Sequence, residues 1–392
     1  MAHTLGHYGA PIVSFYDAQN TSLGELPGWV DLSAAWKWNA PATAVVVTPD
    51  IPELWPDLAK CRTQTVLAAV DDRLHWSGRV TDVEVKIDRD KGVRSTEITM
   101  VDDWAILRTL LARQNPLGDL ANQAAAEFDV REGPAETVVK SLLADIAQRL
   151  DLPMVIAPAP NPDTSPLVRV DTRMDPLDKV IPPLLEAASM RLTVHLHRPG
   201  GHLPASLSDY AAGAVGRWVV DVTPSRNDDF LSWDEAELVN GTLTLSAPTA
   251  SRLIVGGAGE GVEKVYTEVV NADLEASLGP YRLREAYVDD ADGTKTAAAL
   301  ADMAGQVSVA FSVDDGVPWW AGEDFQVGDF AGGTIGGVDF RARLEEIELT
   351  ADDTGTARYV PKIGQAIPPP EVQVARAVAR IADDLAAERR RR

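Results

Sequence analysis

The amino-acid sequence predicts a β-rich α+β fold that is divided into several domains. Short segments in which apolar and polar residues alternate recur through most of the chain, as in half-buried strands. Two longer segments with apolar residues at helical spacing interrupt them in the middle. The 392 residues are long for one hydrophobic core. We predict two small β-barrels, an α+β insert between them, and a C-terminal spacer with an amphipathic helix, at residues 1–115, 216–364, 116–215 and 365–392 respectively.

The first domain is predicted to be a barrel of short strands closed by helices. Residues 74–88 show the strand pattern most clearly, because valines and an isoleucine alternate there with charged side chains. Period two also places Trp36 and Trp38 on one strand face. Asp102 and Asp103 are suited to cap a helix that begins at the next residue, where the helix dipole favours negative charge. The remaining elements are expected as strands at 12–16, 30–38, 44–48, 65–70 and 95–101, and as helices at 52–62 and 104–113.

The insert is predicted to contain two helix–strand units in the same order. Apolar residues at helical spacing precede a β-branched run in each unit. Pro182 and Pro183 fall inside the second helix and are expected to kink or split it. A proline-rich loop is expected at 158–166. The helices are expected at 136–150 and 175–188, and the strands at 154–157 and 192–196.

The third domain is again β-rich. Residues 327–330 are expected to form a strand that reaches a tight turn, and 338–350 to return as a second strand. Apolar residues change parity in this second strand, which predicts a bulge near Glu345 and Glu346. Four glycines, at 332, 333, 336 and 337, are expected to let the backbone reverse. Other strands are expected at 242–246, 252–255, 265–270 and 307–313, and a short helix at 294–303.

Two features of the last third of the chain predict an interface. Residues 361–370 contain three consecutive prolines and are expected to be a stiff spacer. An amphipathic helix over 372–388 follows, and a helix of that length is marginal alone, so its apolar stripe needs a partner. Adjacent tryptophans on a strand face opposite ways, so one of a pair is expected in the core and the other at an interface. The interface candidates are Trp319, Trp320, Val374, Val378, Ile381 and Leu385.

Charge and composition exclude several classes of function. The chain has 36 basic and 59 acidic residues, a net charge of −23, which disfavours specific nucleic-acid binding. The longest apolar run is far below the roughly 20 residues that cross a bilayer, and the N-terminus lacks the pattern of a secretory signal. A single cysteine, Cys61, fits synthesis in a reducing cytoplasm.

The candidate chemical sites favour ordinary structural explanations. The glycines of 255–261 lack dinucleotide-binding spacing, so a plain turn is expected there. His195, His197 and His202 have no evident further metal ligand, and residues 289–293 lack the glutamate of a calcium loop. Cys61 at a helix end is not activated as a nucleophile. We therefore predict no catalytic, cofactor-binding or metal-binding residue, and no enzymatic activity.

The order of elements resembles the tail-tip hub proteins of long-tailed, siphovirus-type phages. The resemblance extends over residues 10–365 and depends on three short motifs. The first is a Trp-Ser-Gly-x-Val strand and the second is an Asp-Asp-Trp helix start, followed by a terminal Gly-Asp turn. These residues are Trp76, Ser77, Gly78, Val80, Asp102, Asp103, Trp104, Gly328 and Asp329.

The resemblance implies a structural virion protein at the tail tip, made in the host cytoplasm. Such a hub forms a homotrimer that closes the tail tube. It contacts the distal-tail ring, the tape-measure protein and other tail-tip or host-binding proteins. A distal-tail or tube-type ring protein and a tail-associated peptidoglycan hydrolase remain the alternatives.

Overall fold

The computed structural model divides the chain into two compact units. Residues 1–240 and 312–363 form the larger unit, and 241–311 and 364–392 form the smaller one. The structure describes residues 11–17, 21–26, 28–49, 65–70, 74–88, 93–159, 165–197, 213, 215–227, 231–233, 238–245, 250–259, 261–278, 285–290, 296, 299, 307–313, 319, 321–322, 324–353 and 357–364. The predicted helices at 52–62 and 372–388 lie outside these residues. So do all but Thr296 and Ala299 of the helix predicted at 294–303.

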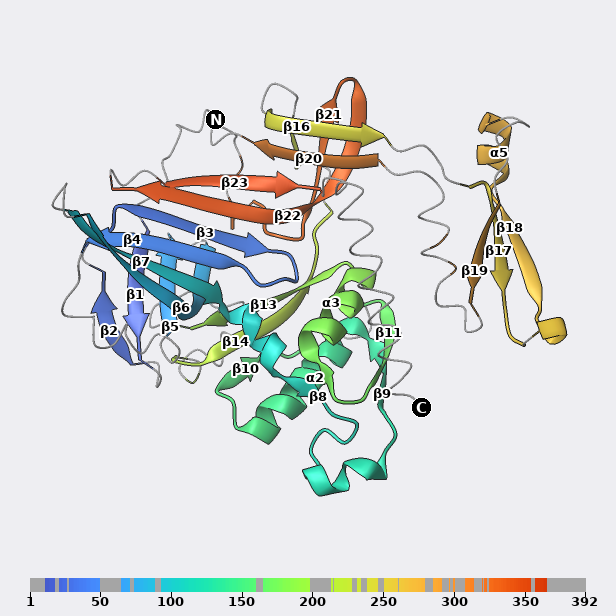
Figure 1. Cartoon of the computed structure of the whole chain (residues 1–392), viewed down its shortest axis with the longest axis horizontal. Coiled ribbons are helices and arrows are strands. Elements are labelled where there is room, and N and C mark those ends of the chain that lie inside the picture. The colour runs from blue at the N-terminus through green and yellow to red at the C-terminus, as the bar shows by residue number, and fades with distance from the viewer. Residues whose placement is uncertain are drawn as a thin grey trace. The chain divides into compact units, whose positions relative to one another are not determined.

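The larger unit is built around an antiparallel sheet with the strand order β23-β22-β3-β4-β7-β6-β5-β1-β2. Its strands are short and alternate in burial, as in β4, where every second side chain is buried. Figure 1 shows the blue strands β3 and β4 beside the orange and red strands β22 and β23. The bounds are β1 (Ile12–Tyr16), β2 (Ser22–Glu25), β3 (Asp31–Lys37), β4 (Thr43–Pro49), β5 (Thr65–Val70), β6 (Leu74–Asp88), β7 (Val93–Asp102), β22 (Val338–Asp352) and β23 (Ala357–Ile363).

Pairing between β3 and β22 joins a strand from the first tenth of the chain to a strand from the last sixth. Trp36 lies opposite Ile347, and the antiparallel register continues to the pair Asp31 and Asp352. The register of β22 against β23 shifts between Leu344 and Glu346, so the predicted bulge is confirmed. One sheet thus contains strands from both of the regions in which the sequence predicts barrels.

A glycine hairpin leads into β22. β21 (Phe330–Ile335) pairs with β22 in antiparallel register, and β15 (Ser232–Trp233) pairs with β21 in parallel. The reversal occurs at Gly336 and Gly337, whose φ values of 59° and 76° suit a tight turn that matches the strand twist. Two details of the prediction are wrong. Gly332 and Gly333 lie inside β21, and residues 327–329 form a turn before the strand begins.

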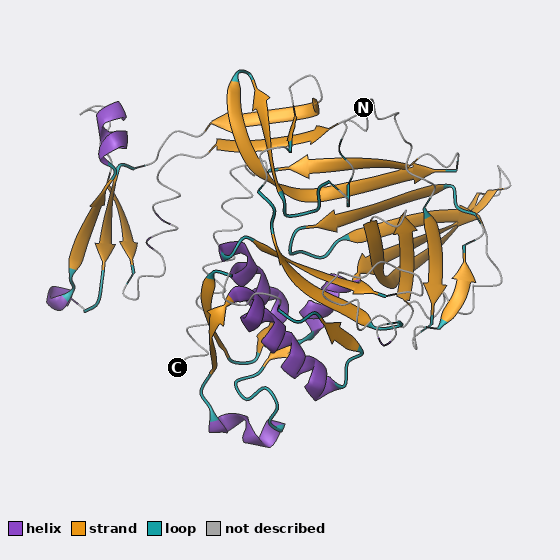
Figure 2. Cartoon of the chain, turned by 180° about the vertical axis from the view of Figure 1, so that it is seen from behind, coloured by secondary structure: helices purple, strands orange, loops and turns teal. Residues whose placement is uncertain are grey.

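The insert is an α+β layer with its own hydrophobic core. The central strand β14 (Trp218–Pro224) pairs in parallel with β10 (Met154–Ile156) and antiparallel with β13 (Met190–Leu196). Figure 2 shows the helices of the larger unit gathered in this part. The core joins leucines and valines of both helices to β13, β14 and the segment after β7. The other elements are η2 (Asp103–Thr109), β8 (Leu111–Ala112), η3 (Leu120–Ala125), β9 (Asp129–Pro134), α2 (Ala135–Leu150), β11 (Leu167–Thr172), β12 (Asp175–Pro176) and α3 (Leu177–Ala187).

Two helix predictions in this region need correction. Helix α3 runs through Pro182 and Pro183 without being split. The neighbouring Ile181 and Leu185 are fully buried, and this packing stabilises the helix despite the missing backbone donors. The helix predicted at 104–113 is instead the 3-10 helix η2, which ends at Thr109, and Asp102 makes no side-chain capping bond to it.

The smaller unit contains a three-stranded sheet. Its central strand β17 (Arg252–Gly256) pairs antiparallel with β18 (Tyr266–Val270) and parallel with β19 (Glu285–Asp289). Leu253 and Val255 point into a small core, while Tyr266 and Tyr287 on the opposite face are 59% and 54% exposed. The elements η7 (Gly261–Glu263) and α5 (Ala272–Leu278) also belong to this unit. β16 (Leu238–Leu245) and β20 (Val307–Val313) straddle the division between the units. The predicted β-rich α+β fold is confirmed.

Candidate functional site: a buried Asp329 clamp and an adjoining pocket

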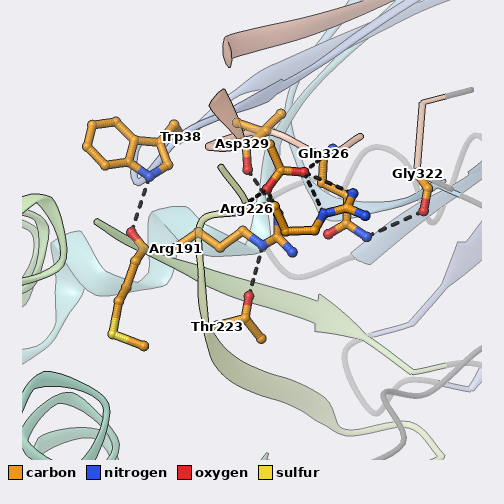
Figure 3. Close-up of polar contacts among 9 residues, drawn as sticks. Trp38, Arg191, Thr223, Arg226, Gly322, Gln326 and Asp329 are labelled. Carbon is orange, nitrogen blue, oxygen red and sulfur yellow. Dashed lines mark hydrogen bonds and ion pairs between the residues drawn. The ribbon is translucent and has the colours of Figure 1, made fainter. Parts of the chain in front are cut away.

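The turn before β21 presents a buried carboxylate to two arginines. Arg191 lies on β13 and Arg226 follows β14, and both converge on Asp329, as Figure 3 shows. Arg191 Nη1 donates to Oδ1 at 3.1 Å, and Arg226 Nη2 and Nε donate to Oδ2 at 2.9 and 3.1 Å. The backbone N–H groups of Arg226 and Gln326 complete the set at 2.9 Å each. Asp329 is 1% exposed, so this cluster, which we call the Asp329 clamp, binds the turn to the insert with charge-assisted hydrogen bonds.

The backbone of the turn is shaped so that the clamp can form. Gly328 has a φ of 95°, which a residue with a side chain adopts only with strain. A Cβ atom there would lie 2.7 Å from Cδ1 of Trp38. The N–H of Gly328 donates to the carbonyl of Leu344, and the N–H of Leu344 donates to the carbonyl of Asp329, both at 2.8 Å. Glycine at 328 therefore permits both the turn and the close approach of an indole.

Trp38 continues the connection toward the insert. Its Nε1 donates to the carbonyl of Met190 at 3.2 Å, and the side chain of Asn39 donates to the same carbonyl at 2.9 Å. The guanidinium of Arg343 lies 3.6 Å from the centre of the Trp38 ring, within the range of a cation–π contact. The end of β3, the start of β13 and the strand β22 are thus held together at one place.

The electrostatics of the clamp favour a structural role. Burial lowers the pKa of Arg191, and the neighbouring Asp329 opposes that effect. Both carboxylate oxygens of Asp329 accept hydrogen bonds, which leaves this group poorly suited to abstract a proton. A second buried group has the same character. Lys140 on α2 donates to Glu136 at 2.6 Å and to Asp221 on β14 at 2.9 Å.

A pocket of about 240 Å³ adjoins the clamp. Trp36, the penultimate residue of β3, and Trp38, in the turn after it, both line it. That the two share one strand face stays a prediction. Trp36 is held by a hydrogen bond from its Nε1 to the carbonyl of His75 at 2.9 Å. Lys37, Arg191 and Gln326 also contribute to the wall. We call it the tryptophan pocket and define it by Trp36, Trp38, His75, Asp102, Trp104 and His195.

Two pairs of titratable residues lie in or behind the tryptophan pocket: His75 with His195, and Asp102 with Asp103. The rings of His75 and His195 are stacked, with centroids 6.2 Å apart and planes 13° from parallel. Burial raises the pKa of Asp102 to about 7, although backbone groups at Ala42 and Ala105 oppose the shift.

The adjacent carboxyl, Asp103, is also buried rather than acting as a helix cap. Burial raises its pKa to about 6, against a lowering effect of its bond with Ser77. Ser77 Oγ donates to Asp103 Oδ2 at 2.5 Å and accepts from the N–H of Leu196 at 2.7 Å. The Trp-Ser-Gly-x-Val and Asp-Asp-Trp motifs therefore meet through one hydrogen-bond chain that also includes β13.

The predicted interface residues fall mostly outside the described part of the chain. Trp319 is half-buried. The other five, Trp320, Val374, Val378, Ile381 and Leu385, lie outside the described residues, so the structure does not bring the six together and their role stays a prediction.

The other sequence candidates are placed as follows. His195 stacks on His75, and burial lowers the pKa of His197. Asp290 Oδ2 accepts a hydrogen bond from the N–H of Thr296 at 2.7 Å. Gly259 has a φ of 100° between β17 and η7. Cys61 and His202 lie outside the described residues. Among the residues that are described, no group of three or more histidine, cysteine and acidic side chains is arranged to hold a metal ion.

The clamp is the part of the site that sequence reasoning missed. The Gly-Asp turn drew attention to Asp329, but Arg191 is 138 residues away and Arg226 is 103 residues away. The side chain of Arg191 is only 13% exposed and is bonded to Asp329 and Thr223. No local pattern marks such a partner.

Within the described segments, no helix has the length and apolar character needed to span a bilayer.

Comparison with known proteins identifies the family. The Siphovirus ReqiPepy6 Gp37-like protein family matches residues 12–365, and the chain therefore belongs to it. A search of curated proteins gave no match.

Three solved structures with a similar fold are described as tail proteins. The tail protein from Neisseria meningitidis MC58 has a TM-score of 0.51 at 12% identity, over 91% of this chain and 97% of that one. The 43 kDa tail protein of prophage MuSo2 from Shewanella oneidensis also scores 0.51, at 10% identity over 90% and 98%. Prophage tail protein gp18 from Listeria monocytogenes EGD-e scores 0.51 at 10% identity over 95% and 99%. At these identities the likeness shows a common fold.

Proposed function

We propose that this chain is a structural protein of the phage tail and acts as the tail-tip hub. The observation that carries the proposal is the combination of a siphovirus family match over 12–365 with a fold shared along nearly the full length of three tail proteins. In this proposal the protein closes the tail tube as a homotrimer. Its partners are the distal-tail ring, the tape-measure protein and host-binding proteins.

The buried charge clusters support a structural rather than a catalytic role. Asp329 is paired with two arginines, and Glu136 and Asp221 share Lys140. Each cluster ties together segments that are distant in the chain, and a carboxylate that is so paired stabilises geometry instead of exchanging protons. A part that must keep its shape while neighbouring rings assemble on it benefits from such connections.

Position in the virion tests the proposal directly. Antibody raised against the purified chain and labelled with gold should decorate the distal end of intact tails in electron micrographs. Labelling along the tube, or of a ring above the tip, would favour the distal-tail or tube-type alternative. Labelling of the capsid only would contradict a tail role altogether.

Self-association tests the trimer. Light scattering should give the mass of a trimer for the full chain, and deletion of residues 366–392 should lower that mass if the C-terminal helix mediates assembly. A monomer in both cases, at concentrations where tails assemble, would contradict the proposed self-assembly. Release of soluble peptides from purified cell walls by the wild-type protein would support the peptidoglycan-hydrolase alternative.

A further inference from the structure

The sheet of β17, β18 and β19 has two different faces, and Figure 1 shows its three strands side by side. Residues that lie opposite one another on paired strands point to the same side of a sheet. The register therefore separates the side chains that pack with Leu253 and Val255 from those on the other side. We call that other side the tyrosine face and define it by Ile254, Tyr266, Glu268, Glu285, Tyr287 and Asp289.

Two exposed aromatic rings form the apolar part of the tyrosine face. Tyr266 and Tyr287 are both more than half exposed, and their ring centroids are 6.4 Å apart. Gly256 lies opposite Tyr266 on the central strand, and a Cβ atom there would be 2.3 Å from the hydroxyl oxygen of Tyr287. Glycine therefore leaves room for the Tyr287 side chain over β17. Exposed aromatic side chains gathered in this way are typical of a binding interface.

Carboxylates outnumber cations around the tyrosine face. Arg252 is bonded to two of these carboxylates, and Lys264 is bonded to a third. Glu285 is exposed on the edge strand β19. The four carboxylates and two cations on the face or beside it are Glu268, Glu275, Glu285, Asp289, Arg252 and Lys264. This excess of negative charge favours a basic ligand.

The last residues of the chain have the complementary character. Residues 371–392 carry six arginines and four carboxylates, within a chain whose net charge is −23. The apolar stripe predicted from Val374 to Leu385 is roughly 16 Å long in a helix, and the five residues of β17 extend over roughly 17 Å. Residues 364–392 also belong to the same compact unit as this sheet. A basic amphipathic helix of this length therefore matches the tyrosine face in charge and in size.

We propose that residues 371–392 dock on the tyrosine face of their own chain. The apolar stripe covers Ile254 and the two tyrosine rings, and the arginines reach the carboxylates. Guanidinium groups also bind the faces of tyrosine rings through cation–π contacts. Because the segment is tethered, its effective concentration at the face is on the order of 1 mM, so a weak intrinsic affinity is sufficient. This docking goes beyond the proposed tail-tip role and does not depend on it.

Hydrogen exchange of the full-length chain, followed by mass spectrometry, tests the docking. The amides of residues 374–388 should exchange at least about 10-fold more slowly than in the free synthetic peptide 371–392, because an isolated helix of this length is marginal. The protection should not change on dilution, since docking within one chain is independent of concentration. Added salt should reduce it, because salt screens the ion pairs.

Variants of exposed residues on the tyrosine face locate the contact. Tyr266→Ser and Tyr287→Ser should each reduce the protection about 3- to 10-fold, whereas Tyr266→Phe keeps the ring and should retain most of it. Glu285→Lys places a positive charge near the arginines and should reduce the protection about 3-fold.

A matched control separates this contact from general effects of the substitutions. Leu167→Ser removes a side chain that is 78% exposed on β11 of the larger unit, and it should exchange as the wild type does. Thermal melting of each variant identifies any that fails to fold. Glu285→Lys carries the test if either serine variant does.

Three results would overturn the proposal. The first is exchange of residues 374–388 that is as fast as in the free peptide. The second is protection that Tyr266→Ser, Tyr287→Ser and Glu285→Lys all leave unchanged, which would place the segment elsewhere. The third is protection that disappears on dilution, which would assign the segment to a contact between copies of the chain. Gold labelling of tails does not bear on any of these results, so the tail-tip proposal and this one fail separately.

Discussion

The two units of the chain differ in the burial of their most connected charged groups. In the larger unit, ionic groups such as Asp329 and Lys140 are buried and paired across long stretches of sequence. In the smaller unit, Arg252 bonds to Glu275 and Glu268, and Lys264 pairs with Asp289, around an open sheet. Removing one partner of a buried ion pair lowers the free energy of unfolding strongly, whereas removing one partner of an exposed pair lowers it little. We therefore expect the buried ionic clusters to contribute more to the stability of the larger unit than the partly exposed pairs contribute to the smaller unit.

Removal of the clamp carboxylate should have the largest effect. Asp329→Ala leaves Arg191 and Arg226 without their buried acceptor, and we expect a loss of about 3–5 kcal/mol in the free energy of unfolding. Denaturant titration of the full chain measures it. Asp339→Ala is the control, because its carboxylate is exposed. Its hydrogen bond on the hairpin is the one that it accepts from Thr334. Equal losses in both variants would show that the Asp329 clamp contributes no more to the free energy of unfolding than an exposed hydrogen bond does.

Substitution of the clamp glycine should have the next largest effect. Gly328→Ala combines a positive φ with a Cβ atom 2.7 Å from the Trp38 ring, and we expect a loss of about 2–4 kcal/mol. Gly336→Ala has a positive φ of 59° but nothing within 4 Å of the added atom. It should lose only about 1–2 kcal/mol, so the difference between the two measures the close approach to Trp38. Melting curves that coincide for the two variants would contradict that close approach.

The buried carboxyls predict how the stability of the larger unit depends on pH. The pKa values of Asp102 and Asp103, about 7 and 6, are raised above the ordinary 3.8 by burial. The folded state therefore binds more protons than the unfolded state between pH 4 and 7. The stability due to this binding is fully present below about pH 4 and is lost as the pH rises through 6 and 7. From pH 5 to 8 the loss should be about 4 kcal/mol, since Asp102 contributes about two pKa units and Asp103 about one in this window and each unit corresponds to about 1.4 kcal/mol.

Neutral variants check that assignment. In Asp102→Asn and Asp103→Asn the decline of the free energy of unfolding between pH 5 and 8 should be shallower than in the wild type, as measured by urea titrations at each pH. Asp339→Asn should keep the wild-type slope. A wild-type protein that becomes more stable as the pH rises across this window would contradict the raised pKa values.

The smallest effect is expected on the open sheet of the smaller unit. Arg252→Ala removes ion pairs that water and salt screen, and amide exchange of β17 and β18 should change only slightly. Added salt should reduce even that change. A loss comparable to that of Asp329→Ala would mean that these exposed pairs are as important as the buried clamp.

Local patterns predicted much of the fold. Helix α2 and the strands β1, β4 and β13 lie where the sequence predicts them, and in β4 every second side chain is buried, as the period of a strand requires. The bulge in β22 was visible as a change of parity near Glu345. The prediction failed at Asp103. Its neighbours in the sequence predict a helix cap, but its side chain is buried and bonded to Ser77 of β6. Helix α3 also continues through Pro182 without being split, because packing overrides the local preference.

The sequence by itself determined the β-rich composition and the order of helices and strands, since both depend on residues within a few positions of one another. Only the tertiary structure decided that β3 pairs with β22 and that Arg191 and Arg226 meet at Asp329. It also decided which side chains enclose the tryptophan pocket. These arrangements join segments more than 100 residues apart, and contacts at that separation are chosen by packing and burial of charge, which no local period records.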